Sequence, residues 1–138
     1  MFQRILVPTD LTERATRALD LALNLAAPGG ARVVLLHVIE TIRGLEAEEA
    51  KPFYQKLEQN AQRIMTTTTQ QLQKTHAEVV QEIVYGDRAV EIVRFAAAHQ
   101  IDLIVLASHK VTSRRDRDWG TISYKVGILA QCPVLLVK

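Results

Sequence analysis

Five short runs of branched apolar residues, separated by longer amphipathic stretches, constrain the fold of this chain most. The runs are Arg4 to Thr9, Arg32 to Ile39, Val79 to Tyr85, Asp102 to Ser108 and Val134 to Lys138. Each is nearly continuous in valine, isoleucine and leucine, which is typical of strands covered on both faces rather than of the alternating strands of a half-exposed sheet. The runs therefore predict a parallel sheet buried between helices.

The first two stretches between these runs predict helices. In the first, apolar residues recur at helical spacing at Ala15, Ala18, Leu19, Ala22, Leu25 and Ala26. Asp10 followed by Glu13 predicts a capping box at the start of this helix, and Pro28-Gly29-Gly30 predicts its end. The second helix is expected from Pro52 to about Thr75, because apolar residues repeat there every three or four positions.

Two further helices are predicted in the second half of the chain. One opens after Gly86 with Asp87 as its N-cap. Its buried residues are expected to be Ala89, Ile92, Val93 and Ala96. The other runs from about Thr121 to Gln131, with an inner face of Ile122, Val126 and Leu129. Strands and helices thus alternate, and because crossovers between parallel strands are right-handed, the fold class is α/β, a doubly wound five-stranded parallel sheet with helices on both faces.

The composition fits one globular domain of 138 residues. With 48% hydrophobic and 23% charged residues, the chain is long enough to bury a core without disulfides or metals. Its single cysteine, Cys132, excludes an intramolecular disulfide and argues against a cysteine-rich zinc site, so an intracellular, reducing compartment is expected. We therefore predict one domain over residues 1–138 with no bound metal.

Charge and hydropathy narrow the expected location and partners. The N-terminal residues lead directly into the first apolar run, and the runs are too short to cross a bilayer, so neither a signal peptide nor a membrane span is predicted. The net charge of +2, from 17 basic and 15 acidic residues, is too small to indicate binding to nucleic acid or to a membrane surface. A cytoplasmic protein is expected.

Polar side chains gather where the predicted strands end, which is where open parallel sheets bind ligands. The first strand ends in Pro8-Thr9-Asp10, the second in His37-Val38 and the fourth in Ala107-Ser108-His109-Lys110. The Asp10 carboxylate could accept a hydrogen bond from a ribose or a base edge, or it could cap the helix that follows. His37 is interpreted as a packing residue at the end of the sheet, and His109 is the better candidate for a ligand contact.

The segment after the fourth strand concentrates positive charge. Between Ser108 and Thr121 it carries four basic residues against two acidic ones, and it leads into the N-terminus of the last predicted helix. The free N–H groups and the positive dipole end of a helix attract anions, so phosphate is a candidate ligand. A solvated loop with its charges in water is the alternative.

Five short motifs follow one another in a particular order. They are Ile5-Leu6-Val7-Pro8-Thr9-Asp10, Leu36-His37-Val38, Gly86, Asp102-Leu103-Ile104-Val105-Leu106 and Cys132-Pro133-Val134-Leu135-Leu136-Val137. In this order and spacing the whole chain resembles the universal stress protein family. The resemblance implies the strand order 3-2-1-4-5, in which Asp10 and Ser108 flank one crevice between the first and fourth strands.

The resemblance also implies an adenine nucleotide, such as ATP or AMP, as ligand, with Mg²⁺ only if a triphosphate is bound. Asp10 and Val38 resemble the adenine and ribose side of the family's site, whereas Gly120, Thr121 and Ile122 resemble its phosphate side. The full set of expected nucleotide-binding residues is Pro8, Thr9, Asp10, Val38, Ala107, Ser108, His109, Lys110, Gly120, Thr121 and Ile122.

One motif of the nucleotide-binding members is altered. They carry Gly-x-x-Gly, nine residues and then Gly-Ser or Gly-Thr, but here Ala107 and Lys110 stand at the first two glycine positions. A side chain forced into the left-handed region costs about 1 to 3 kcal/mol, which would weaken binding. A lysine beside a phosphate contributes roughly 1.5 to 3 kcal/mol, which would strengthen it. We expect a pocket that is retained but binds adenine nucleotides weakly.

Three functional interpretations stay open. The first is a non-enzymatic stress-response or signalling module; nothing in the sequence positions an attacking water, and a slow ATPase activity is left as an alternative. The second is a dimerisation scaffold without a nucleotide, which recognises a protein partner through the basic loop 109–119. The third, a phosphorylated receiver-type domain, fits poorly because such a domain needs an aspartate at the end of the third strand, where Asp87 is interpreted as a helix cap.

The last strand favours self-association. In the implied strand order it lies at an edge of the sheet, and its apolar residues would leave backbone groups available for pairing with another strand. The resemblance implies a homodimer through this strand, with antiparallel pairing about a two-fold axis. The expected interface residues are Val134, Leu135, Leu136 and Val137.

Overall fold

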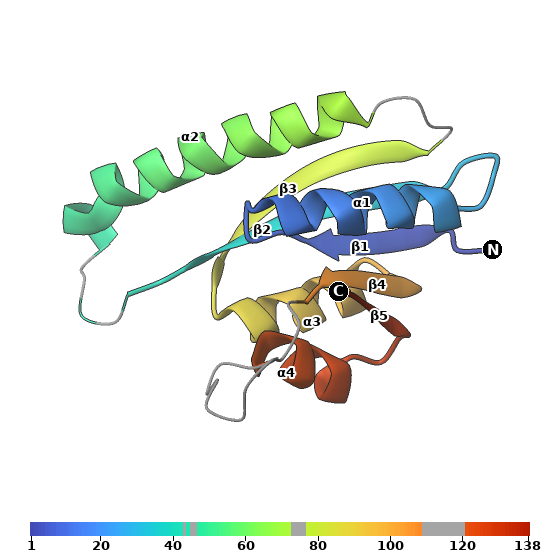
Figure 1. The fold of residues 1–138 in the computed structure, drawn as a ribbon. Helices are drawn as coiled ribbons and strands as arrows, with labels where there is room; N and C mark the ends of the chain where they lie inside the picture. Colours follow the sequence, from blue (N-terminus) through green and yellow to red (C-terminus); the bar gives the residue numbers. More distant parts are fainter. Residues whose placement is uncertain (43, 45–46, 73–76, 109–120) are drawn as a thin grey trace.

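The five apolar runs form five parallel strands. A computed structural model describes residues 1–42, 44, 47–72, 77–108 and 121–138. The strands pair in the order β3-β2-β1-β4-β5 (Figure 1). They are β1 (Arg4–Pro8), β2 (Arg32–Glu40), β3 (Glu78–Gly86), β4 (Leu103–Ala107) and β5 (Val134–Val137). The predicted fold class and strand order are confirmed, and each predicted strand end differs from the observed one by at most one residue.

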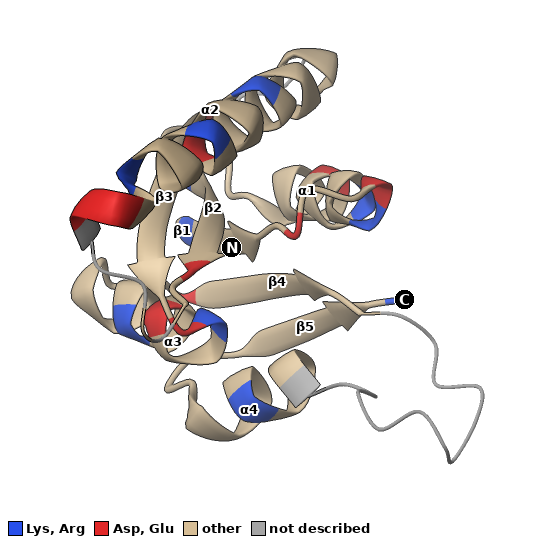
Figure 2. Cartoon of the chain, turned by 90° about the vertical axis from the view of Figure 1, so that its left-hand side faces the viewer, with Lys and Arg blue, Asp and Glu red and all other residues tan. Residues whose placement is uncertain are grey.

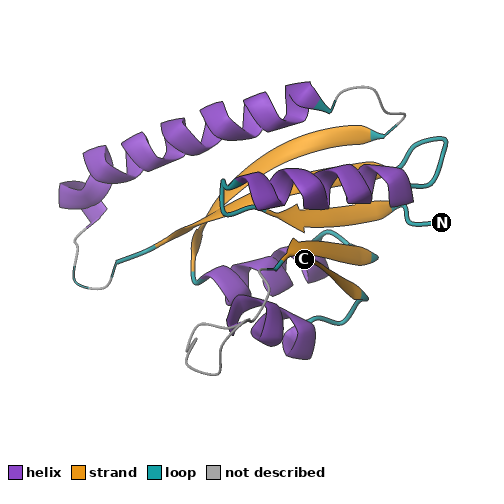
Figure 3. Ribbon diagram, viewed as in Figure 1, coloured by secondary structure: helices purple, strands orange, loops and turns teal. Residues whose placement is uncertain are grey.

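Four helices cover the two faces of this sheet. They are α1 (Glu13–Leu25), α2 (Ala47–Gln71), α3 (Arg88–Ala98) and α4 (Thr121–Leu129). Helices α1 and α2 lie on one face, and α3 and α4 lie on the other (Figures 2 and 3). The sheet is therefore the middle layer of three, which explains why its strands are apolar along most of their length.

Successive residues of β1 show why the central strands carry no alternation of apolar and polar residues. Ile5 and Val7 are buried in the core shared with α1 and α2. Leu6 is buried in the second core, together with Ile92 of α3 and Val126 of α4. Because side chains alternate between the faces of a strand, a sheet with a helical layer on each side buries consecutive positions of its central strands, and only their ends are exposed.

The first helix begins differently from the prediction. Thr12, not Asp10, occupies the N-cap position of α1, and no side chain caps the helix there. The predicted capping box of Asp10 and Glu13 is therefore wrong. The Asp10 carboxylate instead accepts a hydrogen bond from the backbone N–H of Thr12 at 3.0 Å, a local turn that ends just before the helix.

The second helix is shifted relative to its predicted bounds. It begins at Ala47 rather than at Pro52 and ends at Gln71 rather than near Thr75. Pro52 thus lies inside α2, where its missing N–H removes one hydrogen bond to the carbonyl of the preceding turn. In the first half of this helix Ala50 is buried, whereas the larger apolar side chains of Phe53 and Leu57 are exposed.

The third and fourth helices follow the sequence closely at their starts. Asp87 caps α3 by accepting a hydrogen bond from the N–H of Val90 at 3.1 Å, as predicted. Ala89, Ile92 and Ala96 are buried, whereas Val93 is half-buried and Phe95 takes a place in the core. In α4, Val126 is buried, but Leu129 is 52% exposed, so its predicted place on the inner face is wrong.

The strands do not end level with one another, and this difference shapes the carboxyl edge of the sheet. Pro8, the last residue of β1, is paired with Leu36, and β2 continues beyond it to Glu40. Along this extension β2 stays paired with β3 as far as Gly86. The paired strands β2 and β3 therefore extend beyond the carboxyl end of β1.

Candidate functional site

A cavity of about 410 Å³ lies at the carboxyl edge of the sheet, where the strand order reverses between β1 and β4. Cavities of this volume are typical of small-molecule sites. Within the part of the chain that the structure describes, it is bordered by the ends of β1, β2 and β4, by α3 and α4, and by the first turn of α1. The residues that line it are Pro8, Thr9, Asp10, Arg14, Leu36, Val38, Glu40, Arg88, Ile92, Leu106, Ala107, Ser108, Ile122 and Ser123.

The cavity brings together all but one of the predicted nucleotide-binding residues that the structure describes, the exception being Thr121. Pro8, Thr9, Asp10, Val38, Ala107, Ser108 and Ile122 line it. Thr121 is the first residue of α4. His109, Lys110 and Gly120, as well as the basic loop 109–119, lie outside the described residues.

The floor of the cavity is apolar. Leu36 and Val38 reach it from β2, Ile92 from α3 and Leu106 from β4, and all four side chains are buried. They belong to the core that α3 and α4 share with the sheet. The floor is thus one end of a packed hydrophobic core, and a flat apolar group placed on it would be removed from water.

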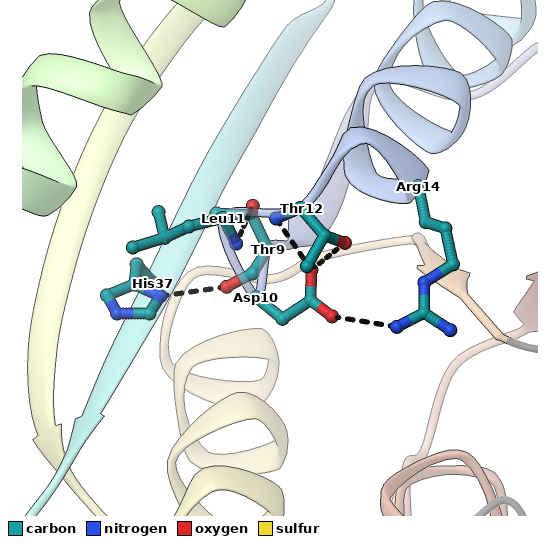
Figure 4. A network of polar contacts seen from close by, with 6 residues as sticks. All are labelled: Thr9, Asp10, Leu11, Thr12, Arg14 and His37. Atoms are coloured by element: carbon teal, nitrogen blue, oxygen red, sulfur yellow. Dashed lines mark hydrogen bonds and ion pairs between the residues drawn. The ribbon is translucent and has the colours of Figure 1, made fainter.

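The β1–α1 loop supplies polar groups on one side of the cavity (Figure 4). Oδ1 of Asp10 accepts hydrogen bonds from the N–H and from the hydroxyl of Thr12, at 3.0 and 2.5 Å. Oδ2 of Asp10 faces the Arg14 guanidinium at 3.7 Å, one turn further along the chain. One carboxylate oxygen is therefore held by the loop, while the other has a longer contact to a cation.

The charged form of Asp10 is favoured in the folded protein. Partial burial by itself would raise the pKa of the carboxyl. The hydrogen bonds from the Thr12 side chain and backbone, together with the Arg14 guanidinium, outweigh that effect and hold the pKa below its ordinary value of 3.8. The cavity therefore presents a carboxylate, which is a hydrogen-bond acceptor, at neutral pH.

Two hydrogen bonds fix the backbone on which Asp10 sits. The Thr9 carbonyl accepts a hydrogen bond from Nδ1 of His37 at 2.8 Å, so the half-buried His37 ties β2 to the end of β1. The Thr9 hydroxyl oxygen accepts a bond from the N–H of Leu11 at 2.9 Å, and Leu11 has a positive φ of 68°. The residues on both sides of Asp10 are thus fixed by hydrogen bonds, and the Asp10 side chain projects toward the cavity from a loop of defined conformation.

A second ion pair lies on the β2 side of the cavity. Glu40 ends β2, Arg88 begins α3, and Oε1 of Glu40 is 3.4 Å from Nε of Arg88. Both side chains are exposed to solvent over a third or more of their surface, so the pair contributes little to stability. It places one donor and one acceptor beside Val38 at the rim.

The β4 side combines backbone and hydroxyl groups. The N–H of Ser108 donates to the carbonyl of Val137 at 2.7 Å, which ties the end of β4 to β5. Ile122 and Ser123 of the first turn of α4 complete this side of the cavity. A helix N-terminus carries unpaired N–H groups and a partial positive charge, so this side favours an anion.

Sequence reasoning missed four charged or hydroxyl residues of the cavity: Arg14, Glu40, Arg88 and Ser123. The contact of Arg14 with Asp10 could have been predicted, because Arg14 follows Asp10 by four residues at the start of a helix. Glu40 and Arg88 are 48 positions apart, and only the pairing of β2 with β3 brings them together.

The described residues contain neither a metal-binding cluster nor a membrane-spanning helix. Within these ranges no group of three or more His, Cys, Asp or Glu side chains is arranged to hold a metal ion. Nor does any helix in this part of the chain have the length and hydrophobicity that crossing a membrane requires.

Comparison with known proteins gives a consistent result. A model of the universal stress protein family matches residues 1–138. Universal stress protein YxiE of Bacillus subtilis is 29% identical in an alignment that covers both chains completely. Universal stress protein MJ0577 of Methanocaldococcus jannaschii is 28% identical, with all of this chain and 96% of that protein aligned.

Solved structures agree with the sequence comparisons. The structure of MJ0577 superposes with a TM-score of 0.85 and 31% identity over 100% of this chain and 96% of that one. Universal stress protein UspA of Lactobacillus plantarum gives a TM-score of 0.81 and 27% identity over 99% and 98%. More distant structures of the same fold, at 20% and 21% identity, are a universal stress protein in complex with cAMP and one from Archaeoglobus fulgidus in complex with dAMP.

Proposed function

The chain belongs to the universal stress protein family, and on that premise we propose that its cavity binds an adenine nucleotide and that the protein is a non-enzymatic stress-response or signalling module. The observation that carries the proposal is the Asp10 carboxylate at the edge of a buried apolar floor, at the switch point of the sheet. The cAMP and dAMP complexes of two distant relatives support adenine as the base.

The cavity offers a different chemistry to each part of a nucleotide. The adenine ring would lie on the apolar floor formed by Leu36, Val38 and Ile92, where its faces are removed from water. A ribose hydroxyl would donate a hydrogen bond to Oδ2 of Asp10. The phosphates would point toward Ser108, Ser123 and the N-terminus of α4.

The residues at the cavity fit a nucleotide without a resident metal. The described side chains form no metal-binding cluster, and Mg²⁺ would enter only with a triphosphate, coordinated by the phosphates themselves. The proposal assigns no chemical step to the site, because binding alone suffices for a module that reports a nucleotide concentration. The Ala107 and Lys110 substitutions in the glycine motif lead us to expect weak binding.

The test combines identification of a bound molecule with titration. The purified protein is denatured, released nucleotides are identified by mass spectrometry, and ATP, ADP, AMP and cAMP are titrated calorimetrically into protein stripped of ligand. We expect micromolar to millimolar binding of at least one of them, which Asp10→Ala weakens. Absence of binding at millimolar concentrations of all four would remove the proposal.

A substitution of Lys110 distinguishes the scaffold interpretation from the nucleotide-binding one. If the lysine fills the phosphate site, Lys110→Gly should create ATP binding in a protein that otherwise has none. If the lysine contacts a phosphate, the same variant should bind ATP less tightly than the original chain. The protein partner that the scaffold would recognise through loop 109–119 would be sought by cross-linking in both backgrounds.

A homodimer through β5 is the second part of the proposal. The strand forms one edge of the sheet, and Leu135 and Leu136 on its two faces are each exposed over more than a third of their surface. The neighbouring helix α4 exposes Tyr124, Ile128 and Leu129. Antiparallel pairing of two β5 strands about a two-fold axis would bury these apolar side chains and use the unpaired backbone groups of the edge.

A further inference from the structure

Arg14 is a cation at the cavity whose contact with its partner is long. Its guanidinium lies 3.7 Å from Oδ2 of Asp10, whereas charge-assisted hydrogen bonds between such groups are about 2.7 to 2.9 Å long. The Arg14 side chain is 50% exposed. Asp10 in turn is anchored through its other oxygen, Oδ1, by Thr12 (Figure 4). The loop therefore keeps its shape without Arg14.

The second arginine of the cavity is placed differently. Arg88 sits at the start of α3 beside Glu40, on the side that the β2 extension forms. Arg14 comes from the opposite face of the sheet, on the first turn of α1. The cavity that it lines is also lined by Ser108 and Ser123. Arg14 thus borders the cavity together with the end of β4 and the start of α4.

The first turn of α4 lacks a charge of its own that would occupy an anion site. It reads Thr-Ile-Ser-Tyr, and none of these four residues is acidic. An anion bound in the cavity between the first turns of α1 and α4 would meet the N-terminus of α4, the hydroxyl of Ser123 and the guanidinium of Arg14, which can reorient. Guanidinium groups bind phosphate through two parallel hydrogen bonds, which is stronger than an exposed ion pair with a carboxylate.

We infer that Arg14 is a phosphate-binding residue that gives the cavity its preference for phosphorylated nucleosides. When a nucleotide binds, the guanidinium moves from Asp10 to a phosphate, and Oδ2 of Asp10 becomes available to the ribose hydroxyl. The inference rests on the proposed function and adds to it the class of ligand: a nucleotide is preferred over the corresponding nucleoside, through a residue that lies outside the glycine motif.

The test compares ligands that differ only in their phosphates. Adenosine and ADP are titrated calorimetrically into the original chain, into Arg14→Gln and into Arg17→Gln. Arg17 is the matched control because it lies on the same helix, is exposed and does not line the cavity. We expect Arg14→Gln to weaken ADP binding by about ten-fold or more, the range of a charge-assisted hydrogen bond, and to leave adenosine affinity within about two-fold. Arg17→Gln should change neither.

A second readout follows the guanidinium itself. In ¹⁵N-labelled protein, the Nε–H signal of Arg14, assigned by its loss in Arg14→Gln, should shift with ADP and with inorganic pyrophosphate but not with adenosine. Both variants should keep the circular dichroism spectrum and melting temperature of the original chain, because these side chains are exposed.

The outcomes separate the two claims. Equal losses of ADP and adenosine affinity in Arg14→Gln would mean that Arg14 only positions Asp10, and the phosphate role would be overturned while the nucleotide site stands. Unchanged affinities for both ligands would overturn it in the same way. If the original chain binds neither ligand at millimolar concentration, the proposed function and this inference both fail.

Discussion

Asp10 and Thr12 form a closed local turn: one carboxylate oxygen of Asp10 accepts both the backbone N–H and the hydroxyl of Thr12. An aspartate just before a helix would ordinarily be expected to cap the N-terminus of that helix. Here it holds the loop, while its second oxygen faces the cavity and Arg14. The same side chain thus shapes the loop and presents an acceptor to a ligand.

The pH dependence of stability should report this turn. The folded-state pKa of Asp10 lies below the ordinary 3.8, so the stability from its carboxylate is present above pH 3.8 and is lost as the pH falls through the lower, folded-state value. We expect Asp10→Asn to lower the melting temperature at pH 7, and the difference from the original chain to shrink as the pH falls below 3.8 and through the lower, folded-state pKa of Asp10. Asp20→Asn, on the exposed side of α1, controls for the loss of a surface carboxylate. A difference that is constant with pH would contradict the prediction.

Tyr85 should titrate at unusually high pH. Its hydroxyl donates a hydrogen bond to the Glu58 carboxylate across the contact between β3 and α2, and this bond, helped by partial burial and by the negative charge of Glu58, raises the pKa of Tyr85 to about 12. The stabilisation from the bond is therefore present below pH 10 and is lost as the pH rises through about 12. Phenolate absorbance at 295 nm, with Tyr85→Phe subtracted, measures the pKa.

Glu58→Gln removes the negative charge while keeping an acceptor. We expect it to lower the pKa of Tyr85 toward the ordinary value of 10. Identical titrations of Tyr85 in the two proteins would show that the contact with Glu58 is not formed in solution.

Gly86 is required at the end of β3 for two reasons. Its φ is +146°, which side-chain-bearing residues rarely adopt, and a Cβ there would lie 2.8 Å from Cγ of Glu91. We expect Gly86→Ala to lower the free energy of unfolding by about 1 to 3 kcal/mol in urea titrations. Gly127→Ala is the matched control, because a Cβ at that helical position meets nothing within 4 Å; it should be neutral or stabilise by up to about 1 kcal/mol. Equal effects of the two substitutions would refute the argument.

A charge on the edge strand should dissociate the proposed dimer. Leu135→Lys places an ammonium group in the middle of β5, where antiparallel pairing would bring two such charges close together. Sedimentation at tens of micromolar should show a dimer for the original chain and a monomer for Leu135→Lys. Val90→Lys, an exposed apolar residue of α3, should leave the dimer intact. An original chain that sediments as a monomer would rule out this part of the proposal.

Most of the fold could be predicted because it depends on local patterns. The apolar runs locate each strand, since a strand covered on both faces is apolar at most of its positions. The cap of α3 was predictable because Gly86 and Asp87 act on their immediate neighbours. The start of α1 was not, because Asp10 and Thr12 are both good capping residues, and the prediction chose the one that instead forms the preceding turn.

The cavity was predictable only in part, for a related reason. Asp10 and Val38 follow from the rule that ligands bind at the carboxyl ends of parallel strands. Glu40 and Arg88 could not be found in this way, because their contact depends on how far β2 continues past the end of β1 and on the register between β2 and β3. No short stretch of sequence encodes that length difference.

Because β2 extends past the end of β1, different parts of the chain determine the shape of the cavity and the charges that face a ligand. The part of β2 beyond Pro8 stays paired with β3, and in the proposed complex Val38 on it would limit how deep a base can enter. In the proposed complex, Asp10 of the short β1–α1 turn and Arg14 of α1 would meet the polar part of the ligand, while Glu40 at the end of β2 pairs with Arg88. Substitutions in β2 could therefore change which ligand shape the cavity accepts, and substitutions in the β1–α1 turn could change which ligand charge it prefers. Each change could occur without the other.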